Sequence, residues 1–383
     1  MNTPDQPGSA PSSPVVETAR RFALEAIDPH APEWERNRRF PRETFTKAAA
    51  EGLCGLLVPP EMGGAGLGIG GMAAVMRELA GADMGLAFAL VCHNNLAGAI
   101  ANKGTEFHRE RYVGPMLDGS TVGAFLLTEP DTGSDAAAIS TTATPQGDGW
   151  VLNGAKAWAT NATDADVMNC YAQTEPGSGP RGIAAFLIEA DQPGVVREDA
   201  YEMLGAHSTG TGSFRFENVQ LTPDQLFIAP GLAFRAAMEA IDIARIVVSA
   251  MCAGMLRRGL ETAVEYISSR EAFGAPLSDK QGLRWMLADV ATDLEAATAL
   301  TAAASAALDN GDPDMAVRAA HAKKFATRVT MDGLSQCMQA LGANGYRQDR
   351  PLARHLAGAK MTHYLDGTTE IQNVVIARSL FGS

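Results

Sequence analysis

The sequence predicts an α+β protein in which a small β domain lies between two helical domains. Apolar residues recur at helical spacing over residues 15–120, and short alternating or β-branched runs separated by turn formers occupy residues 121–230. Long helical patterns return over residues 231–383 and predict a four-helix bundle. A chain of 383 residues is long enough for several packed units, so we expect a tail (1–14) followed by these three domains.

The N-terminal segment, residues 1–14, is rich in proline and serine and lacks lysine and arginine. This composition favours a disordered tail over an arginine-rich transit peptide. Helical spacing begins at Val15 and is interrupted by prolines 59–60 and by the glycine-dense segment 63–68. The glycine-dense segment lacks the Lys-Ser/Thr pair of a phosphate-binding loop, so we expect a flexible turn there.

The middle region predicts short strands because β-branched or alternating runs at 150–152, 184–188 and 213–216 are bounded by turn formers. The turn formers at 146–149 and 176–180 include several glycines and predict tight connections between strands. A small β domain is the expected result.

The C-terminal region returns to helix, with apolar residues at helical spacing over 281–308. The turn formers 309–311 end this helix, and Asp312-Pro313 begins the next. Alanine-rich surfaces in these helices allow close approach, which suits an oligomer interface and intramolecular packing equally well.

Composition excludes several classes of protein. The net charge of −13 disfavours nucleic-acid binding, which requires clustered lysine and arginine. The five cysteines are odd in number and widely separated, so we expect a reducing cytoplasm and neither disulfides nor a zinc site. No apolar run long enough to span a membrane and no secretion signal is recognised. The histidines lack metal-ligand spacing, and we expect no metal.

Three separated groups of residues indicate a ligand-binding function. Residues 125–135 read Phe-Leu-Leu-Thr-Glu-Pro-Asp-Thr-Gly-Ser-Asp, and residues 156–161 read Lys-Ala-Trp-Ala-Thr-Asn. The third group comprises segments 268–281, 339–346 and 366–372, the last reading Asp-Gly-Thr-Thr-Glu-Ile-Gln. Hydroxyls and backbone N–H groups on a glycine-containing turn can bind a polar ring edge or a pyrophosphate, and an indole offers a flat apolar face. Read alone, these segments are also compatible with a turn, a core tryptophan and a glycine helix cap.

Together, and in this order over nearly the whole chain, the segments resemble the acyl-CoA dehydrogenase family. The resemblance implies a homotetramer or homodimer that binds FAD, with an acyl-CoA or acyl-carrier thioester as substrate and an electron-transferring flavoprotein as electron acceptor. It also implies a place in fatty acid or amino acid catabolism.

The resemblance assigns individual residues to the site. The residues implied for FAD are Phe125, Leu127, Thr128, Ser134, Trp158, Thr160, Arg270, Phe273, Gln281, Gln339, Gly342, Thr368 and Glu370. The residues implied for the substrate are Ser134, Asp242, Arg245 and Gly367. In the family, Arg270 and Gln281 would reach the FAD of a neighbouring subunit.

The catalytic position departs from the usual family pattern. Most members carry the base as a glutamate immediately before a Gly-Thr pair, and here that residue is Asp366, which would take the α proton while the flavin takes the β hydride. Aspartate retracts the carboxylate by roughly 1.5 Å, a displacement that can cost about a hundredfold in rate if nothing compensates. Some members carry the base at the position of Ala244, where no carboxylate exists. Burial near flavin would raise the pKa of Asp366.

Other interpretations remain open at this point. Asp366 before Gly-Thr-Thr-Glu is also a helix-start pattern, and Asp242 with Arg245 could be a structural ion pair. The polar residues 93–95 lie where relatives form the pocket floor but do not decide the substrate. Alternatives to acyl-CoA dehydrogenation are dehydrogenation of cyclic acyl-CoAs or carrier-protein thioesters, desulfination, and a non-catalytic flavin-binding assembly role. A flavin oxygenase ranks last because Asp366 is still a carboxylate.

Overall fold

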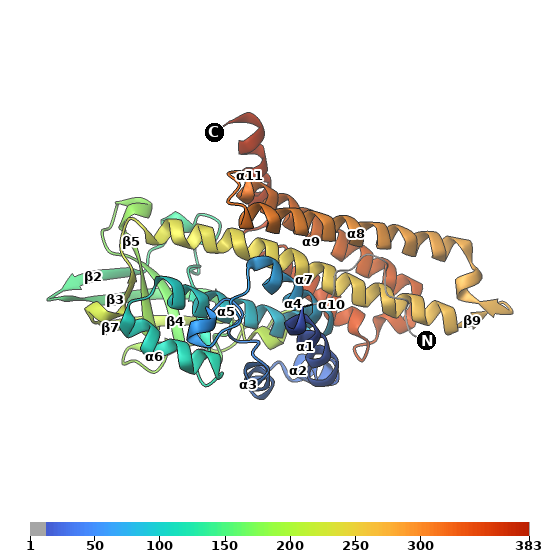
Figure 1. Cartoon of the computed structure of the whole chain (residues 1–383), viewed down its shortest axis with the longest axis horizontal. Coiled ribbons are helices and arrows are strands. Elements are labelled where there is room, and N and C mark those ends of the chain that lie inside the picture. Colours follow the sequence, from blue (N-terminus) through green and yellow to red (C-terminus); the bar gives the residue numbers. More distant parts are fainter. Residues whose placement is uncertain (1–12, 383) are drawn as a thin grey trace.

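The computed structural model describes residues 13–382 and arranges them as two helical parts joined through a β domain, which confirms the expected α+β fold (Figure 1). The expected tail (1–14) lies almost entirely outside the described residues, and the first helix begins at Pro14. The sheet lies at one end of the molecule, and the long C-terminal helices run away from it (Figure 1).

The N-terminal helices include one long, apolar helix. The helices are α1 (Pro14–Phe22), continued by a π-helical turn (Ala23–Ile27), α2 (Ala31–Asn37), α3 (Arg42–Ala50), α4 (Ile69–Ala82), α5 (Met84–Lys103) and α6 (Glu106–Leu117). Among the described residues, α5 is long and apolar enough to cross a membrane by composition, but 83% of its most apolar window is buried inside the protein. It is therefore a core helix. Asp83 caps it by accepting a hydrogen bond from the backbone N–H of Leu86 at 2.8 Å.

The β domain is one mostly antiparallel sheet. Its strands are β1 (Gly123–Leu126), β2 (Thr142–Gln146), β3 (Gly149–Ala159), β4 (Val167–Gln173), β5 (Ile183–Glu189), β6 (Val195–Arg197), β7 (Gly212–Leu221) and β8 (Leu226–Ile228). They follow the order β6-β7-β3-β2-β4-β5-β8, and β1 pairs in parallel with β4, so that Phe125 lies opposite Asn169. Alternate residues of β4 point to opposite faces. One set joins the core inside the β domain, and the other set packs towards α5 and α6.

The C-terminal helices form the predicted bundle. They are α7 (Ala233–Ser269), α8 (Gln281–Asp309), α9 (Met315–Ala340), α10 (Pro351–Thr362) and α11 (Thr369–Phe381), with a short hairpin of β9 (Glu271–Ala272) and β10 (Ala275–Pro276) after α7. Helix α7 has 37 residues and is about 55 Å long at 1.5 Å per residue. It runs from the sheet to the hairpin at the far end of the molecule (Figure 1). In α8, Ala297 and Ala304 are buried whereas Ala302 is exposed, so the alanines serve internal packing and also reach the surface.

A buried carboxylate joins the two helical parts of the chain. Glu78 on α4 is 3% exposed and lies 2.8 Å from Arg257 on α7, 3.2 Å from Arg20 on α1 and 3.3 Å from Arg77. Burial alone would raise the pKa of Glu78, but the arginines, Arg257 above all, lower it to about 2. The carboxylate is therefore ionised at neutral pH and links three helices.

Candidate active site

The structure brings the first two predicted segments side by side. The backbone N–H of Ala157 donates to the carbonyl of Thr128 at 2.9 Å, and the buried ammonium of Lys156 donates to the carbonyl of Leu127 at 2.9 Å. Lys156 also pairs with the buried carboxylate of Glu129 at 2.8 Å. Burial would raise the pKa of Glu129, but Lys156 lowers it to about 2. This ion pair fixes the loop after β1 against the end of β3.

Trp158 is turned outward at this junction by an irregularity in the strand. The pairing of β3 with β7 shifts register between Lys156 and Ala159, and Trp158 has φ of 57°. A positive φ is an outlier for a bulky residue, and such strain recurs at functional sites. The indole is 61% exposed, and its ring centroid lies 4.6 Å from that of Tyr201. Thr160, two residues later, is buried. The strand thus presents a flat aromatic surface beside a hydroxyl.

The turn that carries Asp366 is held by three side chains acting on its backbone. Asp366 and Gly367 have φ of 50° and 89°, and they lie between α10 and α11. Arg245 donates from Nε to the carbonyl of Asp366 at 3.0 Å, and Gln372 donates from Nε2 to the carbonyl of Gly367 at 2.9 Å. The buried ammonium of Lys323 donates to the same Gly367 carbonyl. A Cβ at Gly367 would lie 3.1 Å from Arg245 Nη2, so glycine is favoured there by space and by backbone conformation.

These contacts leave the Asp366 carboxylate itself free. Its Oδ2 atom is buried and has no hydrogen-bond partner among the described residues. Thr368 caps α11 instead, because its hydroxyl accepts from the backbone N–H of Ile371 at 3.4 Å. The interpretation of Asp366 as a helix cap is therefore wrong. Burial raises the pKa of Asp366 to about 6, while Lys323 and Arg245 oppose that rise.

Asp366 opens into a cavity of about 90 Å³ between α5, α7 and the sheet. The residues that line it are Phe88, Val91, Cys92, Asn95, Leu96, Ala99, Lys103, Phe125, Asn169, Tyr171, Phe227, Ile228, Ala236, Ala240, Ile241, Ala244 and Asp366. Asp366 is the one carboxylate among these described residues, and Ala244, the other position considered for a base, lies in the same wall. Burial raises the pKa of the Cys92 thiol, the nearby charge of Asp366 adds to the rise, and the neighbouring Thr160 opposes it. The cavity thus adjoins both the carboxylate and the Trp158–Thr160 segment.

The polar residues at the expected pocket floor divide between two roles. Only Asn95 lines the cavity. The ring of His93 lies 3.0 Å from the Met116 carbonyl and accepts from the Gly123 backbone N–H at 3.1 Å, and burial lowers its pKa to about 4. The Asn94 side chain bonds to the Leu90 carbonyl within α5 and to the backbone of Leu53 and Leu56 in the loop after α3. His93 and Asn94 are core residues that satisfy buried backbone groups, which the sequence did not reveal.

Asp242 and Arg245 form an ion pair at 2.6 Å, with Arg245 6% exposed. Arg245 therefore links the pair to the Asp366 turn, whereas neither side chain lines the cavity. The ion pair thus helps to hold the Asp366 turn in place. Sequence reasoning missed Lys323 altogether, because nothing local marks a lysine on α9 as a neighbour of a turn 44 residues away.

Several residues implied for FAD lie far from this site. Arg270, Phe273 and Gln281 are exposed around the β9–β10 hairpin, with Phe273 95% exposed. The segment after α9, near Gln339 and Gly342, is joined to the same end because Asn344 donates to the Tyr266 hydroxyl at 2.9 Å.

The distance along α7 shows how far apart the two groups are. Arg245 and Arg270 are separated by 25 positions on α7 and its cap, or about 37 Å. Figure 1 shows the hairpin and the sheet at opposite ends of the molecule. The Asp366 turn, which Arg245 contacts, therefore lies far from the hairpin that carries Arg270 within one chain.

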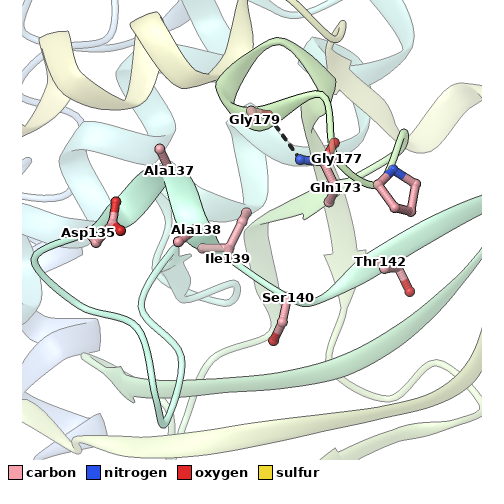
Figure 2. A pocket seen from close by; sticks show the side chains of 10 residues that line it. Asp135, Ala137, Ala138, Ile139, Ser140, Thr142, Gln173, Gly177 and Gly179 are labelled. Carbon is pink, nitrogen blue, oxygen red and sulfur yellow. Dashed lines mark hydrogen bonds between the residues drawn. The ribbon is translucent and has the colours of Figure 1, made fainter.

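A larger and more open hollow of about 520 Å³ lies between the loops 135–142 and 173–179 (Figure 2). The Gln173 amide donates to the Gly179 carbonyl at 2.9 Å across its rim. Asp135 is its charged residue, and no lysine or arginine is among the described residues that line it, so electrostatics do not favour a phosphate there. Ser134 is exposed just before this segment, and Glu370 is exposed on α11. Within residues 13–382, no group of three or more histidine, cysteine or acidic side chains could hold a metal.

Comparison with known families agrees with this geometry over most of the chain. Residues 13–120 match the acyl-CoA dehydrogenase N-terminal domain, residues 124–219 match the middle domain, and residues 234–381 match the C-terminal domain. The chain therefore belongs to the acyl-CoA dehydrogenase family, a family of FAD-dependent oxidoreductases.

Particular relatives resemble the chain over almost its full length. The mitochondrial short-chain specific acyl-CoA dehydrogenase of Bos taurus is 36% identical over 368 residues, which cover 96% of this chain and 89% of the relative. The butyryl-CoA dehydrogenase structure from Megasphaera elsdenii is 32% identical with a TM-score of 0.93, covering 98% of this chain and 99% of that one. A chain in the structure described as "Electron transferring flavoprotein of Acidaminococcus fermentans: Towards a mechanism of flavin-based electron bifurcation" is 34% identical with a TM-score of 0.92, covering 96% and 97%.

Proposed function

We propose that the chain catalyses FAD-dependent α,β-dehydrogenation of a short acyl-CoA thioester, with Asp366 as the base that removes the α proton. The observation that carries the proposal is the buried, unpartnered Oδ2 of Asp366 in a cavity with no other carboxylate among its described residues. The names of the relatives support a short acyl group, and so does the cavity volume of about 90 Å³.

The residues near the cavity fit FAD. Trp158 offers an exposed indole face on a strained strand, and Thr160 and Thr128 supply hydroxyls beside it. The ion pair of Lys156 with Glu129 holds these segments together without occupying the exposed surface. When bound there, FAD would supply the acceptor for the hydride of the β carbon.

The protein's own part is to hold and move the proton. At neutral pH an Asp366 carboxyl group with a pKa of about 6 is mostly ionised, and it can accept the α proton at Oδ2. Arg245, Gln372 and Lys323 act on the backbone carbonyls of the turn and not on the carboxylate oxygens. The position of the carboxylate is therefore fixed while its lone pairs stay available.

A second copy of the chain would complete the cofactor site. Arg270, Phe273 and Gln281 are exposed around the β9–β10 hairpin, at the end of the molecule opposite the sheet, which suits contact with FAD held by a partner subunit. We therefore propose a homodimer or a dimer of dimers. The exposed Arg270 fork is suited to a pyrophosphate.

Two further proposals follow from the family and from composition. The electrons would pass to an electron-transferring flavoprotein, which is supported by the likeness to a chain in a structure of that description. A cytoplasmic location is supported by five free cysteines, which suit a reducing compartment.

Anaerobic titration of the purified flavoprotein with acyl-CoAs tests the proposed reaction. A short acyl-CoA is expected to bleach the oxidised-flavin absorbance, and Asp366→Asn is expected to slow bleaching at least about a hundredfold while FAD content is kept. Asp148→Asn, in the exposed turn between β2 and β3, is the matched control and is expected to bleach like the natural protein.

Two outcomes would contradict the proposal. Unchanged bleaching by Asp366→Asn would remove Asp366 from the base role. No bleaching by straight, branched, cyclic or acidic acyl-CoAs would favour a carrier-protein thioester, other chemistry or a non-catalytic role.

A further inference from the structure

A polar pair is built into the wall of the cavity that holds Asp366. Asn169 on β4 is 4% exposed, and its Oδ1 atom is buried with no hydrogen-bond partner within residues 13–382. Its Nδ2 donates to the hydroxyl of Tyr171 at 3.3 Å, and Tyr171 is 2% exposed. Being two residues apart on a strand, the side chains share one face, and both line the cavity. A buried carbonyl oxygen without a donor is unfavourable, so a bound molecule that supplies a donor to this oxygen would stabilise the cavity wall.

No other described residue satisfies the remaining hydrogen-bonding groups of Asn169 and Tyr171. The structure gives the proton of the Tyr171 hydroxyl no acceptor, because its hydrogen bond is the one it accepts from Asn169. Much of the remaining wall is apolar, including Phe88, Leu96 and Ile241. A purely hydrocarbon acyl group would leave the Asn169 oxygen and the Tyr171 proton unsatisfied. A group that both donates and accepts a hydrogen bond would satisfy the two together.

The charges around the cavity argue against a carboxylate in that place. Besides Asp366, the charged lining residue is Lys103, whose side chain is 52% exposed and lies 3.9 Å from Glu239. Lys103 is the last residue of α5, 11 positions beyond Cys92, or about 16 Å along the helix. The Asn169 oxygen is itself an acceptor and would repel a second acceptor. The pair therefore favours an uncharged group that both donates and accepts a hydrogen bond.

We propose that the acyl group of the substrate carries a hydroxyl beyond its β carbon, with that hydroxyl donating to Asn169 Oδ1 and accepting from the Tyr171 hydroxyl. This inference rests on the proposed dehydrogenation and names its substrate class as short hydroxyacyl thioesters. At about 10–15 Å³ for each water-sized group, a cavity of about 90 Å³ has room for a short chain with one such hydroxyl.

Binding of coenzyme A thioethers tests the inference separately from turnover, because a thioether has no carbonyl and cannot be dehydrogenated in the proposed way. The probes are S-pentyl-CoA and its 4-hydroxy, 5-hydroxy and 4-carboxybutyl counterparts, and Kd is read from perturbation of the flavin spectrum of the holoenzyme. One hydroxylated tail is expected to bind at least tenfold more tightly than S-pentyl-CoA, since a site with buried polar groups rejects an analogue that cannot pair with them.

Substitutions of Asn169 and Tyr171 test whether these two residues select the hydroxylated tail. Asn169→Leu keeps the shape of the side chain without its polarity, and Tyr171→Phe removes only the hydroxyl. The double variant removes both polar groups and leaves neither unpaired. In each variant the ratio of the Kd values for the plain and hydroxylated tails is expected to fall to about one or below. Asn153→Leu on β3, where Asn153 bonds to the exposed Asn218, is the control and should keep the natural ratio.

The outcomes distinguish this inference from the proposed function. Equal or weaker binding of the hydroxylated tails by the natural enzyme overturns the inference, and bleaching by butyryl-CoA would leave the dehydrogenation standing. Tightest binding of the carboxylated tail would also overturn it and would favour Lys103 as the selecting group. Loss of FAD from Asn169→Leu and from the double variant would show a structural or cofactor role and would equally contradict it. Failure of every thioether to bind would contradict both proposals.

Discussion

Asp366 owes its ionisation near neutral pH to two opposing influences. Burial disfavours the charged carboxylate and raises its pKa, whereas the cations Lys323 and Arg245 stabilise the charge and limit the rise to about 6. Lys323 is itself buried, which lowers its pKa to about 8, so it is still largely charged at pH 7. The pKa of Asp366 is therefore set in part by two residues that do not line the cavity.

The acidic limb of kcat/KM is expected to have an apparent pKa near 6, with activity rising as the pH rises because the base must be ionised. Lys323→Met removes a cation that favours the carboxylate, so the limb should move to higher pH by about one unit. Steady-state kinetics between pH 5 and 8 measure this shift.

Lys324→Met is the matched control, because Lys324 is exposed on the same helix. Its pH profile should coincide with that of the natural enzyme. A Lys323→Met enzyme whose limb stays in place, with only a lower maximum rate, would assign Lys323 to the structure of the turn and not to the acidity of Asp366.

At the scale of helices, Glu78 is the main electrostatic link between α4, α1 and α7. Its folded-state pKa of about 2 lies below the ordinary value of 4.5. The stability that it contributes is therefore present above about pH 4.5 and is lost as the pH falls through about 2.

Glu78→Gln should destabilise the protein by about 3 kcal/mol at pH 7, because it leaves Arg257 partly buried without its anion. Thermal unfolding followed by circular dichroism should show a fall in Tm of several degrees, and the gap from the natural protein should narrow as the pH drops below 4.5. Glu198→Gln, which breaks an exposed pair with Arg215, should change stability by no more than about 0.5 kcal/mol. Equal losses of stability from the two substitutions would show that the buried Glu78 pairs stabilise the protein no more than an exposed ion pair does.

The sequence predicted well those features that depend on local pattern. The order of helical and strand regions, the 125–135 and 156–161 segments and the Asp366 turn could all be found from spacing and motif, and the structure brings them together. The glycine-dense segment 63–68 lies between a short helical turn (Pro60–Met62) and α4, and residues 13–62 contain no strand.

Features that depend on long-range packing could not be found in this way. One of the donors to the Gly367 carbonyl is Lys323 on α9, and the donor to the Asp366 carbonyl, Arg245, lies 121 residues away in the sequence. Asn169 occupies a strand where a polar residue reads as an ordinary interruption, and only the cavity shows that its oxygen lacks a donor. His93 and Asn94 are expected near the pocket because relatives form its floor at this point, and only the structure shows that Asn95 alone of the three lines the cavity.

At the scale of the whole molecule, the two halves of the proposed cofactor site predict complementation between subunits. Trp158→Ala and Arg270→Ala, each alone, should leave protein with less than a tenth of the normal FAD. When the two variants carry different tags and are purified as mixed dimers, one of the two sites contains both intact residues. Flavin absorbance per chain should then return to about half of the natural value.

The geometry of α7 makes this experiment decisive. If each FAD were held by one chain only, every site in the mixed dimer would carry one defect and no flavin would return. Tag-selected homodimers of each variant, prepared in parallel, are the controls, and their flavin absorbance per chain should stay below a tenth of the natural value.

Because α7 is one continuous helix, it also fixes the rotation of the hairpin about the helix axis relative to the Asp366 turn. At 3.6 residues per turn, one residue inserted between Arg245 and Arg270 would rotate the hairpin by about 100° relative to the Asp366 turn, and seven residues would restore the angle but add about 10 Å. Single substitutions along α7 leave this rotation unchanged, whereas a change in the number of residues between the two arginines does not. In the proposed dimer, the length of α7 would therefore set the distance between one site and the hairpin that reaches the partner's FAD.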